Sequence, residues 1–212
     1  MINNGWQKSK AKVFWGEIAP CEHVLQIYED DDSFLDVLTN FVGDGINSAE
    51  SVIVIASQAH IDGLESRLRA HGINVSVLAE SNAYLPVNAE EALSKFMVNG
   101  WPDEALFTEA ITEIINKAKK ANPRIRAFGE MVAILWAQGN SGATVNLEHL
   151  WNKFCENESF SLFCAYPKAG FTQDANDSLL HICQSHSKMV TGTHSGAGDI
   201  FYKNIQSSTV NL

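Results

Sequence analysis

The chain has 212 residues, a formal net charge of −10 and 45% hydrophobic residues. This length and apolar content predict one folded domain with a substantial core and exclude a wholly disordered chain. The acidic balance disfavours nucleic acids and anionic membranes as partners, because either would need a basic surface.

Strands and helices alternate along most of the chain. Residues 1–22 show no clear period and are predicted to form an N-terminal arm. The continuous apolar runs HVLQIY (23–28) and SVIVIAS (51–57) predict strands buried on both faces, which is typical of a parallel sheet. Further strands are predicted at VSVL (75–78), AYLPV (83–87), RIRAFG (124–129) and FSLFCAY (160–166).

Helical periodicity follows most of these strands. Helices are predicted over 31–46, 61–72, 88–97, 103–122, 130–139, 145–154 and 174–185. The alternation predicts a three-layer α/β fold with a mainly parallel central sheet, in one domain over residues 23–187. The polar, glycine-rich residues 188–212 are predicted to be a flexible C-terminal tail.

The first strand ends in a turn of four acidic residues, Glu29 to Asp32. A phosphate-binding loop needs glycines and a lysine, and this turn has neither. Its carboxylates would repel a triphosphate, so we expect neither binding nor hydrolysis of ATP. Asp31 or Asp32 can cap the following helix, whereas Glu29 stands at the strand end, where α/β folds bind ligands.

A second carboxylate, Glu130, follows Gly129 at the end of the RIRAFG strand. It is interpreted either as a helix-start carboxylate or as a ligand contact. If Glu29 and Glu130 face one cleft, they could perform acid–base catalysis, hold a metal or bind a cationic or hydrogen-bonding ligand. The residues alone leave these alternatives open.

Histidines give a weaker signal. His60 follows the 51–57 strand on the side of the predicted cleft, close to Ser57, whereas His23 starts the first strand at the opposite end and is interpreted as structural. Three residues near the C-terminus resemble metal ligands: His181, Cys183 and His186. They do not share one helix face and no fourth ligand is adjacent, so we predict no metal site and no cofactor.

Aromatic and sulfur-containing residues also lie near the predicted strand ends, although such spacing is more typical of a core. The complete set of predicted ligand-binding residues is Tyr28, Glu29, Ser57, His60, Glu130, Met131, Trp136 and Tyr166. We identify no catalytic set, and Ser57 is a weak candidate for a nucleophile.

The four cysteines are far apart and form no C-x-x-C pair, which predicts free thiols in a reducing compartment. No apolar run approaches the ~18 residues of a membrane span. No apolar segment follows the N-terminal lysines, so we expect no signal peptide. We therefore predict a cytoplasmic protein.

Several uncommon strings occur together in one order: HVLQIYED, VIVIAS, LPVNAEEALSKFMVNGWPD, RAFGEMVAILWAQGN, LEHLWNKF and FSLFCAYP. In this order and spacing the chain resembles the MEDS domain from about His23 to His186. MEDS is the sensory domain named for methanogens, methylotrophs and the repressor of dichloromethane dehalogenase. The strings GWPD and FGEMVAILW are the most specific.

The resemblance implies a RecA/KaiC-like fold without a phosphate-binding loop, and the acidic turn lies where such an ATPase would hold its phosphates. It also implies a domain that senses small molecules such as hydrocarbon derivatives, alone or attached to DNA-binding or histidine-kinase modules. The 22 leading residues are too few for a helix-turn-helix, so we expect no direct DNA binding. The positions within the recurring strings are Tyr28, Glu29, Gly129, Glu130, Trp136 and Tyr166.

Our leading hypothesis is a stand-alone sensory domain in signal transduction that is not an enzyme. Its partners would be a small organic ligand and a signalling protein such as a histidine kinase or regulator, with a homo-oligomer as a further possibility. The alternatives are a protein-interaction module derived from an ATPase fold and, less favoured, a carboxylate-dependent enzyme that uses Glu29 and Glu130.

Overall fold

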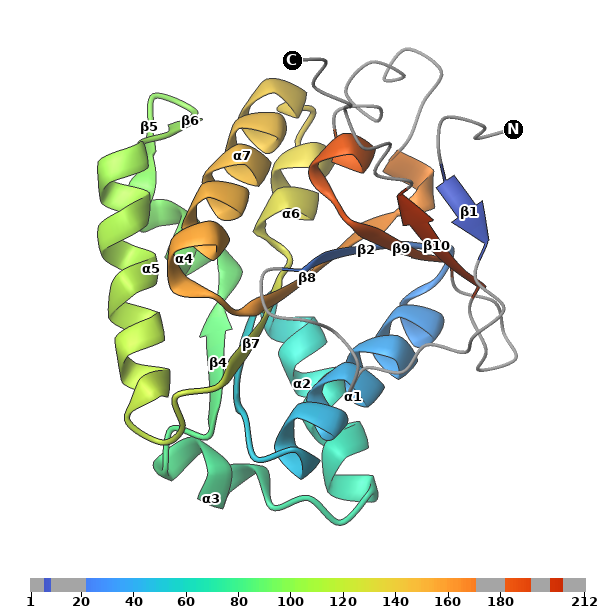
Figure 1. The fold of residues 1–212 in the computed structure, drawn as a ribbon, viewed down its shortest axis with the longest axis vertical. Helices are drawn as coiled ribbons and strands as arrows, with labels where there is room; N and C mark the ends of the chain where they lie inside the picture. Colours follow the sequence, from blue (N-terminus) through green and yellow to red (C-terminus); the bar gives the residue numbers. More distant parts are fainter. Residues whose placement is uncertain (1–5, 9–21, 171–181, 192–198, 204–212) are drawn as a thin grey trace, which may run out of the picture.

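A computed structural model describes residues 6–8, 22–170, 182–191 and 199–203 (Figure 1). Its centre is a sheet with the strand order β1-β10-β9-β2-β8-β7-β3-β4. The six strands from β9 to β4 are parallel, and β10 and β1 add an antiparallel edge. The predicted three-layer α/β fold with a mainly parallel sheet is confirmed.

The strands of this sheet are short and mostly buried. They are β1 (Trp6–Lys8), β2 (His23–Tyr28), β3 (Ser51–Ala56), β4 (Tyr84–Asn88), β7 (Ile125–Gly129), β8 (Ser161–Pro167), β9 (Lys188–Thr191) and β10 (Asp199–Lys203). A separate small hairpin pairs β5 (Met97–Val98) with β6 (Trp101–Pro102).

Helices cover both faces of the sheet (Figure 1). One face carries α1 (Asp31–Asn47), α2 (Gln58–Ala70) and α3 (Val75–Glu80). The other carries α4 (Ala89–Phe96), α5 (Glu104–Lys119), α6 (Met131–Ala137) and α7 (Ser141–Glu158). Side chains alternate between the two faces along each strand, so each face has its own hydrophobic core. Among the described residues, no helix combines the length and apolarity needed to cross a membrane.

The acidic turn is explained by helix α1. Asp30, rather than Asp31 or Asp32, is the N-cap, because its carboxylate accepts the backbone N–H of Ser33 at 2.8 Å. Asp31 and Asp32 occupy the first helical turn, where the helix dipole favours negative charge. Asp32 also accepts a hydrogen bond from Arg67 of α2 at 2.8 Å.

The prediction of a strand at VSVL is wrong, because these residues begin helix α3. Asn74 caps this helix by accepting the N–H of Val77 at 3.3 Å. In a strand, Val75 and Val77 would lie on the same face, whereas Val75 is 3% exposed and Val77 is 55% exposed. Four residues are too few for the apolar pattern to separate a strand from a helical turn.

The sheet extends into both terminal segments of the chain. Strand β9 lies in the predicted flexible tail, pairs in parallel with β2 and buries Met189 and Val190. Strand β10 pairs with β9, and β1, from the predicted N-terminal arm, pairs with β10. The expectation of a flexible tail therefore does not hold for these strands, which are too short to produce a clear sequence period. Of the helix predicted at 174–185, residues 182–185 are helical and 171–181 lie outside the described residues.

Candidate functional site

Polar residues follow two neighbouring strands at the carboxyl edge of the sheet. β3 and β7 are parallel neighbours, with Ile55 opposite Gly129. Just beyond this pair, the N–H of Glu130 donates to the carbonyl of Ile55 at 2.8 Å. This bond extends the ladder by one residue and fixes Glu130 beside the turn that leads from β3 into α2.

The carboxylate of Glu130 links that turn to strand β7. Its Oε2 accepts the backbone N–H of Ser57 at 2.8 Å, and its Oε1 lies 2.8 Å from Nδ1 of His60. The side chain makes no capping hydrogen bond to α6, and the residue is 7% exposed. The carboxylate of Glu130 therefore does not cap α6, which was one of its two interpretations from the sequence.

His60 is held between two carboxylates of different exposure. The hydrogen bond to Glu130 raises the pKa of His60, while partial burial opposes the rise and the negative charges of Glu130 and Asp31 add to it. An ionised carboxylate can only accept, so Nδ1 carries the proton of the bond to Glu130. Nε2 then points toward Asp31, whose Oδ1 is 3.8 Å away and largely exposed.

Aromatic rings form one wall beside this histidine. Tyr28 stacks on Phe34 with ring centroids 4.8 Å apart, and Phe34 meets His60 edge-on at 4.9 Å. Burial raises the pKa of Tyr28, and the charges of Glu130 and Asp31 raise it further. The phenol therefore stays neutral at physiological pH and can both donate and accept a hydrogen bond. We call Tyr28, Asp31, Ser57, His60 and Glu130 the His60–Glu130 site.

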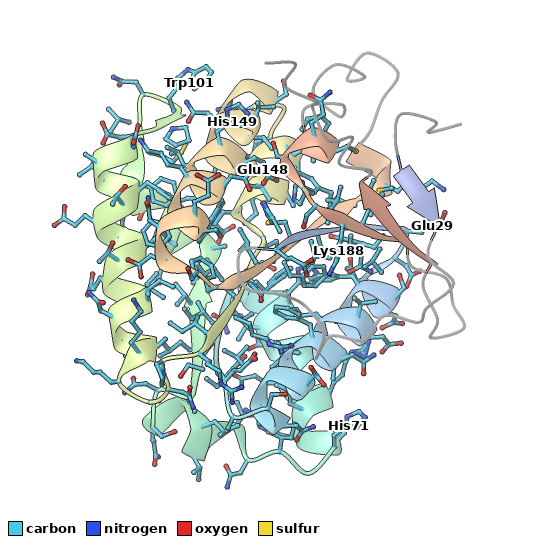
Figure 2. The ribbon with its side chains drawn as sticks, in the orientation of Figure 1. Glu29, His71, Trp101, Glu148, His149 and Lys188 are labelled. Carbon is cyan, nitrogen blue, oxygen red and sulfur yellow. The ribbon has the colours of Figure 1, made fainter. Side chains whose placement is uncertain are left out.

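The remaining predicted ligand-binding residues lie elsewhere. Glu29 is exposed and forms an ion pair with Lys168, on the side of the sheet that carries β10 (Figure 2). Met131, Trp136 and Tyr166 are buried in the core under α4 to α7, on the opposite face from Tyr28. The structure thus brings together four of the eight predicted residues, and their ligand-binding role stays a prediction.

A second polar cluster was missed in the sequence. His23 at the start of β2, Glu148 on α7, Cys164 on β8 and His186 before β9 are buried with their ligating atoms all within 4.8 Å of one another. Figure 2 shows Glu148 on α7, which packs over the sheet. We call these four residues the α7 cluster. His186 belongs to the trio for which the sequence predicted no metal site. The other two members of that trio are not in this set: His181 is outside the described residues, and Cys183 is buried but is not one of the four.

Burial dominates the electrostatics of the α7 cluster. It lowers the pKa of His23 to about 4 and raises that of Glu148 to about 8, although the hydrogen bond from Tyr166 opposes the rise at Glu148. It also raises the pKa of the Cys164 thiol. One sequence signal could have found the cluster. Glu148 lies four residues after Thr144 and three before Trp151, on the buried stripe of α7, where a lone carboxylate needs partners.

A groove of about 200 Å³ lies away from both polar clusters. It runs along the edge strand β4 between α4 and α5, and its walls include Pro86, Ala92 and Ile114. Two lysines, Lys95 and Lys117, stand at its rim. None of the residues predicted to bind ligand lines it.

The chain resembles known proteins in its family and in its fold. The family model described as "MEDS: MEthanogen/methylotroph, DcmR Sensory domain" matches residues 22–187. No curated protein matches the chain in sequence. Two solved structures are similar in fold: the PH0250 protein of Pyrococcus horikoshii OT3 and the flagellar accessory protein FlaH of Methanocaldococcus jannaschii.

The first of these aligns with a TM-score of 0.57 at 12% identity, over 92% of this chain and 92% of that one. The second aligns with a TM-score of 0.56 at 11% identity, over 87% of this chain and 78% of that one. At this identity the likeness concerns the fold alone. It bears out the predicted RecA-like architecture.

Proposed function

The chain belongs to the MEDS family of sensory domains, and from this premise we propose that it senses a small, weakly polar organic molecule at the His60–Glu130 site. In the proposal, the ligand lies at the carboxyl ends of β2, β3 and β7. This is the edge at which open α/β sheets bind their ligands. Binding then changes how the domain docks on a signalling partner, by favouring one of two conformations.

The proposal rests on the hydrogen bonds that the Glu130 carboxylate makes. A nearly buried carboxylate at a helix start would ordinarily accept N–H groups of its own helix. Glu130 instead bonds the N-cap residue and the first turn of α2, through the Ser57 N–H and His60 Nδ1. The side chain therefore orients a histidine and ties together two strand-to-helix turns that any ligand at this edge would contact.

The chemistry of His60 suggests the class of ligand. With Nδ1 committed to Glu130, Nε2 is the ring nitrogen left to meet a ligand, and the side chain is 14% exposed. The raised pKa of His60 favours the protonated ring, in which Nε2 is also a donor. A carbonyl, hydroxyl or ether oxygen can accept that proton, while the rings of Tyr28 and Phe34 provide an apolar wall. Anions are disfavoured by Asp31 and Glu130.

The test uses the whole chain and a panel of small alcohols, ketones, amides and alkyl halides, followed by amide and imidazole NMR signals. A ligand at this site should shift the Ser57 amide and the His60 ring signals. Glu130→Gln should weaken its binding at least tenfold, which is about 1.4 kcal/mol. Glu158→Gln removes an equally charged carboxylate paired with Lys119 far from the site, and should bind as the wild type does.

Glu29→Gln separates two versions of the proposal. If only Glu130→Gln weakens binding, Glu29 lies outside the site, in line with its ion pair to Lys168. If both do, the ligand spans both carboxylates, as the sequence suggests. Equal binding by wild type and Glu130→Gln would refute a ligand site at Glu130.

A second candidate function is a protein-interaction module, and the β5–β6 hairpin favours it. Trp101 at the hairpin is 51% exposed, and Val98 opposite it is 45% exposed (Figure 2). Exposed aromatic side chains are common anchors of protein interfaces. Sedimentation of the wild type and Trp101→Ala tests this candidate for self-association: a smaller species in the variant supports it, and an unchanged species removes Trp101 as the anchor of an oligomer.

A further inference from the structure

The α7 cluster is composed of four side chains that commonly bind metals. The exposed fraction is 3% for His23, 1% for His186 and zero for Glu148 and Cys164. Glu148 Oε2 lies 3.6 Å from Nε2 of His23 and 3.7 Å from Nε2 of His186. Nε2 of His23 lies 3.0 Å from Sγ of Cys164.

Both histidines are oriented by an oxygen acceptor on their other nitrogen. Nδ1 of His23 is 2.9 Å from Oδ1 of Asn152, whose amide nitrogen donates to the carbonyl of Ser185 at 2.9 Å and so fixes the amide orientation. Nδ1 of His186 is 2.6 Å from the carbonyl of Ile182. Each Nδ1 therefore carries a proton, and in the neutral rings each Nε2 presents its lone pair to the cluster.

The carboxylate of Glu148 is held in the same manner. Its Oε1 accepts the hydroxyl of Tyr166 at 2.5 Å. Its Oε2 is buried and has no hydrogen-bond partner among the described residues. A buried carboxylate oxygen without a partner is costly, so an atom that can satisfy it is expected nearby.

We propose that the α7 cluster is a structural zinc site, with Nε2 of His23, Nε2 of His186, Sγ of Cys164 and Oε2 of Glu148 as ligands. Zinc prefers four such nitrogen, sulfur and oxygen donors in a tetrahedron, with bonds of about 2.0–2.3 Å. Those bonds place the ligand atoms roughly 3.3–3.8 Å apart. The two contacts to Glu148 lie in this range. The His23–Cys164 contact needs to lengthen by a few tenths of an ångström, and the remaining pairs lie within 4.8 Å, so any pair beyond the range needs to shorten when the ion binds.

Charge and outer-sphere contacts agree with this assignment. Zn²⁺ with one thiolate, one carboxylate and two neutral imidazoles has no net charge, which suits a site excluded from water. Metal-bound histidines usually donate their second N–H to an oxygen, as both do here. Four protein ligands leave no open position, which is typical of structural rather than catalytic zinc.

The zinc would connect segments that are far apart in the sequence. His23 begins β2 and His186 lies two residues before β9, the strand that pairs with β2 on the side away from β8. Cys164 lies on β8, the other neighbour of β2, and Glu148 reaches them from α7. The ion would thereby fix the C-terminal part of the chain to the central sheet, on the opposite face from the His60–Glu130 site. The proposed zinc site is independent of the proposed sensory function.

The test starts with the full chain, purified without chelator and without a histidine tag. Elemental analysis should find about one zinc per chain, and removing it should lower the melting temperature. Cobalt titrated into the metal-free protein should give tetrahedral d–d bands and a thiolate-to-cobalt charge-transfer band. Absence of bound metal and of these bands in the wild type would overturn the proposal and leave a metal-free hydrogen-bonded cluster.

Variants assign the ligands. Cys164→Ser should abolish the charge-transfer band, whereas Cys155→Ser, which alters another buried cysteine on α7, should keep it. Asn152→Ala removes the partner of His23 Nδ1 together with the hydrogen bond to the Ser185 carbonyl, leaves all four ligands in place, and should weaken zinc binding roughly 10–100-fold. If Cys164→Ser does not fold, the triple variant Cys21→Ser/Cys155→Ser/Cys183→Ser decides. A retained band there assigns the thiolate to Cys164, and its loss in folded protein assigns it to another cysteine and overturns the site.

Discussion

The substitution Glu130→Gln tests the geometry of the His60–Glu130 site without a known ligand. It keeps the size of the side chain and removes its charge. Glutamine can still accept the Ser57 N–H through Oε1, but its nitrogen meets His60 as a donor. The ring of His60 must then accept at Nδ1, so the protonated ring loses its best partner.

The magnitude follows from the bonds involved. A hydrogen bond to a charged group contributes about 1.5–3 kcal/mol and a neutral one about 0.5–1.5 kcal/mol, so replacing one by the other should lower the free energy of unfolding by about 1 kcal/mol. Glu130→Ala should cost more, because the Ser57 N–H and His60 Nδ1 are both left without their acceptor. The cost is roughly 1–3 kcal/mol for a fully buried group, and these two partly buried groups should lie toward the low end of that range.

The pH dependence gives the sharper result. The pKa of His60 is raised in the folded protein, chiefly by its hydrogen bond to Glu130. Such a group stabilises the fold fully below its unfolded pKa, about 6.5, and the contribution is lost as pH rises through the folded pKa. The difference in stability between wild type and Glu130→Gln should therefore be largest near pH 6 and shrink at higher pH.

Two measurements check this prediction on the same samples: denaturant unfolding at several pH values, and NMR titration of the His60 ring. A His60→Gln variant identifies the ring signal by its loss. The pKa of His60 should fall toward its ordinary value in Glu130→Gln. An unchanged titration of His60 in a folded Glu130→Gln variant would show that the two side chains do not interact in solution, and the described site would be wrong.

The remaining predictions concern the fold and the acidic turn. Gly45→Ala should lower the free energy of unfolding by roughly 1–3 kcal/mol in a denaturant assay, because the added Cβ would lie 2.6 Å from Cδ of the buried Arg126. The control Gly43→Ala has nothing within 4 Å of the added Cβ and should be neutral or slightly stabilising in the same assay. Calorimetry with Mg-ATP should detect no binding, since the turn after β2 is acidic; micromolar affinity would contradict this. Removing the residues after Lys188 should lower the melting temperature by many degrees, because the two buried side chains of β9 contribute about 1.5–3 kcal/mol each. An unchanged melting temperature would show that β9 does not stabilise the sheet in solution.

Much of the fold could be predicted from the sequence, because its strongest patterns are local. The run SVIVIAS is apolar on both faces and forms a central parallel strand, and the caps at Asn88 and Asp103 are where the residue types indicate. The prediction of a strand at VSVL was wrong because four residues do not define a hydrophobic period. Strand β9 was not predicted because its place in the sheet depends on pairing with the edge of β2, which the local sequence does not reveal.

The candidate site could be predicted only in part, for a topological reason. Glu130 and His60 were identified because both follow a strand, and strand ends share one edge of a parallel sheet. Trp136 and Tyr166 were placed with them because the sequence does not say which face of the sheet a strand-end aromatic takes. The α7 cluster depends on a contact between His23 and His186, which are brought together by strands β2 and β9 from opposite ends of the chain.

A crystal structure of the whole chain with the tightest-binding member of the panel would show directly whether a small molecule binds at His60 and Glu130. We expect an oxygen acceptor of the ligand at hydrogen-bond distance from Nε2 of His60, about 2.7–3.2 Å, and the apolar part of the ligand against the ring of Tyr28. A ligand seated instead in the groove along β4, with the His60–Glu130 bond undisturbed and the ring of Tyr28 uncontacted, would contradict this expectation.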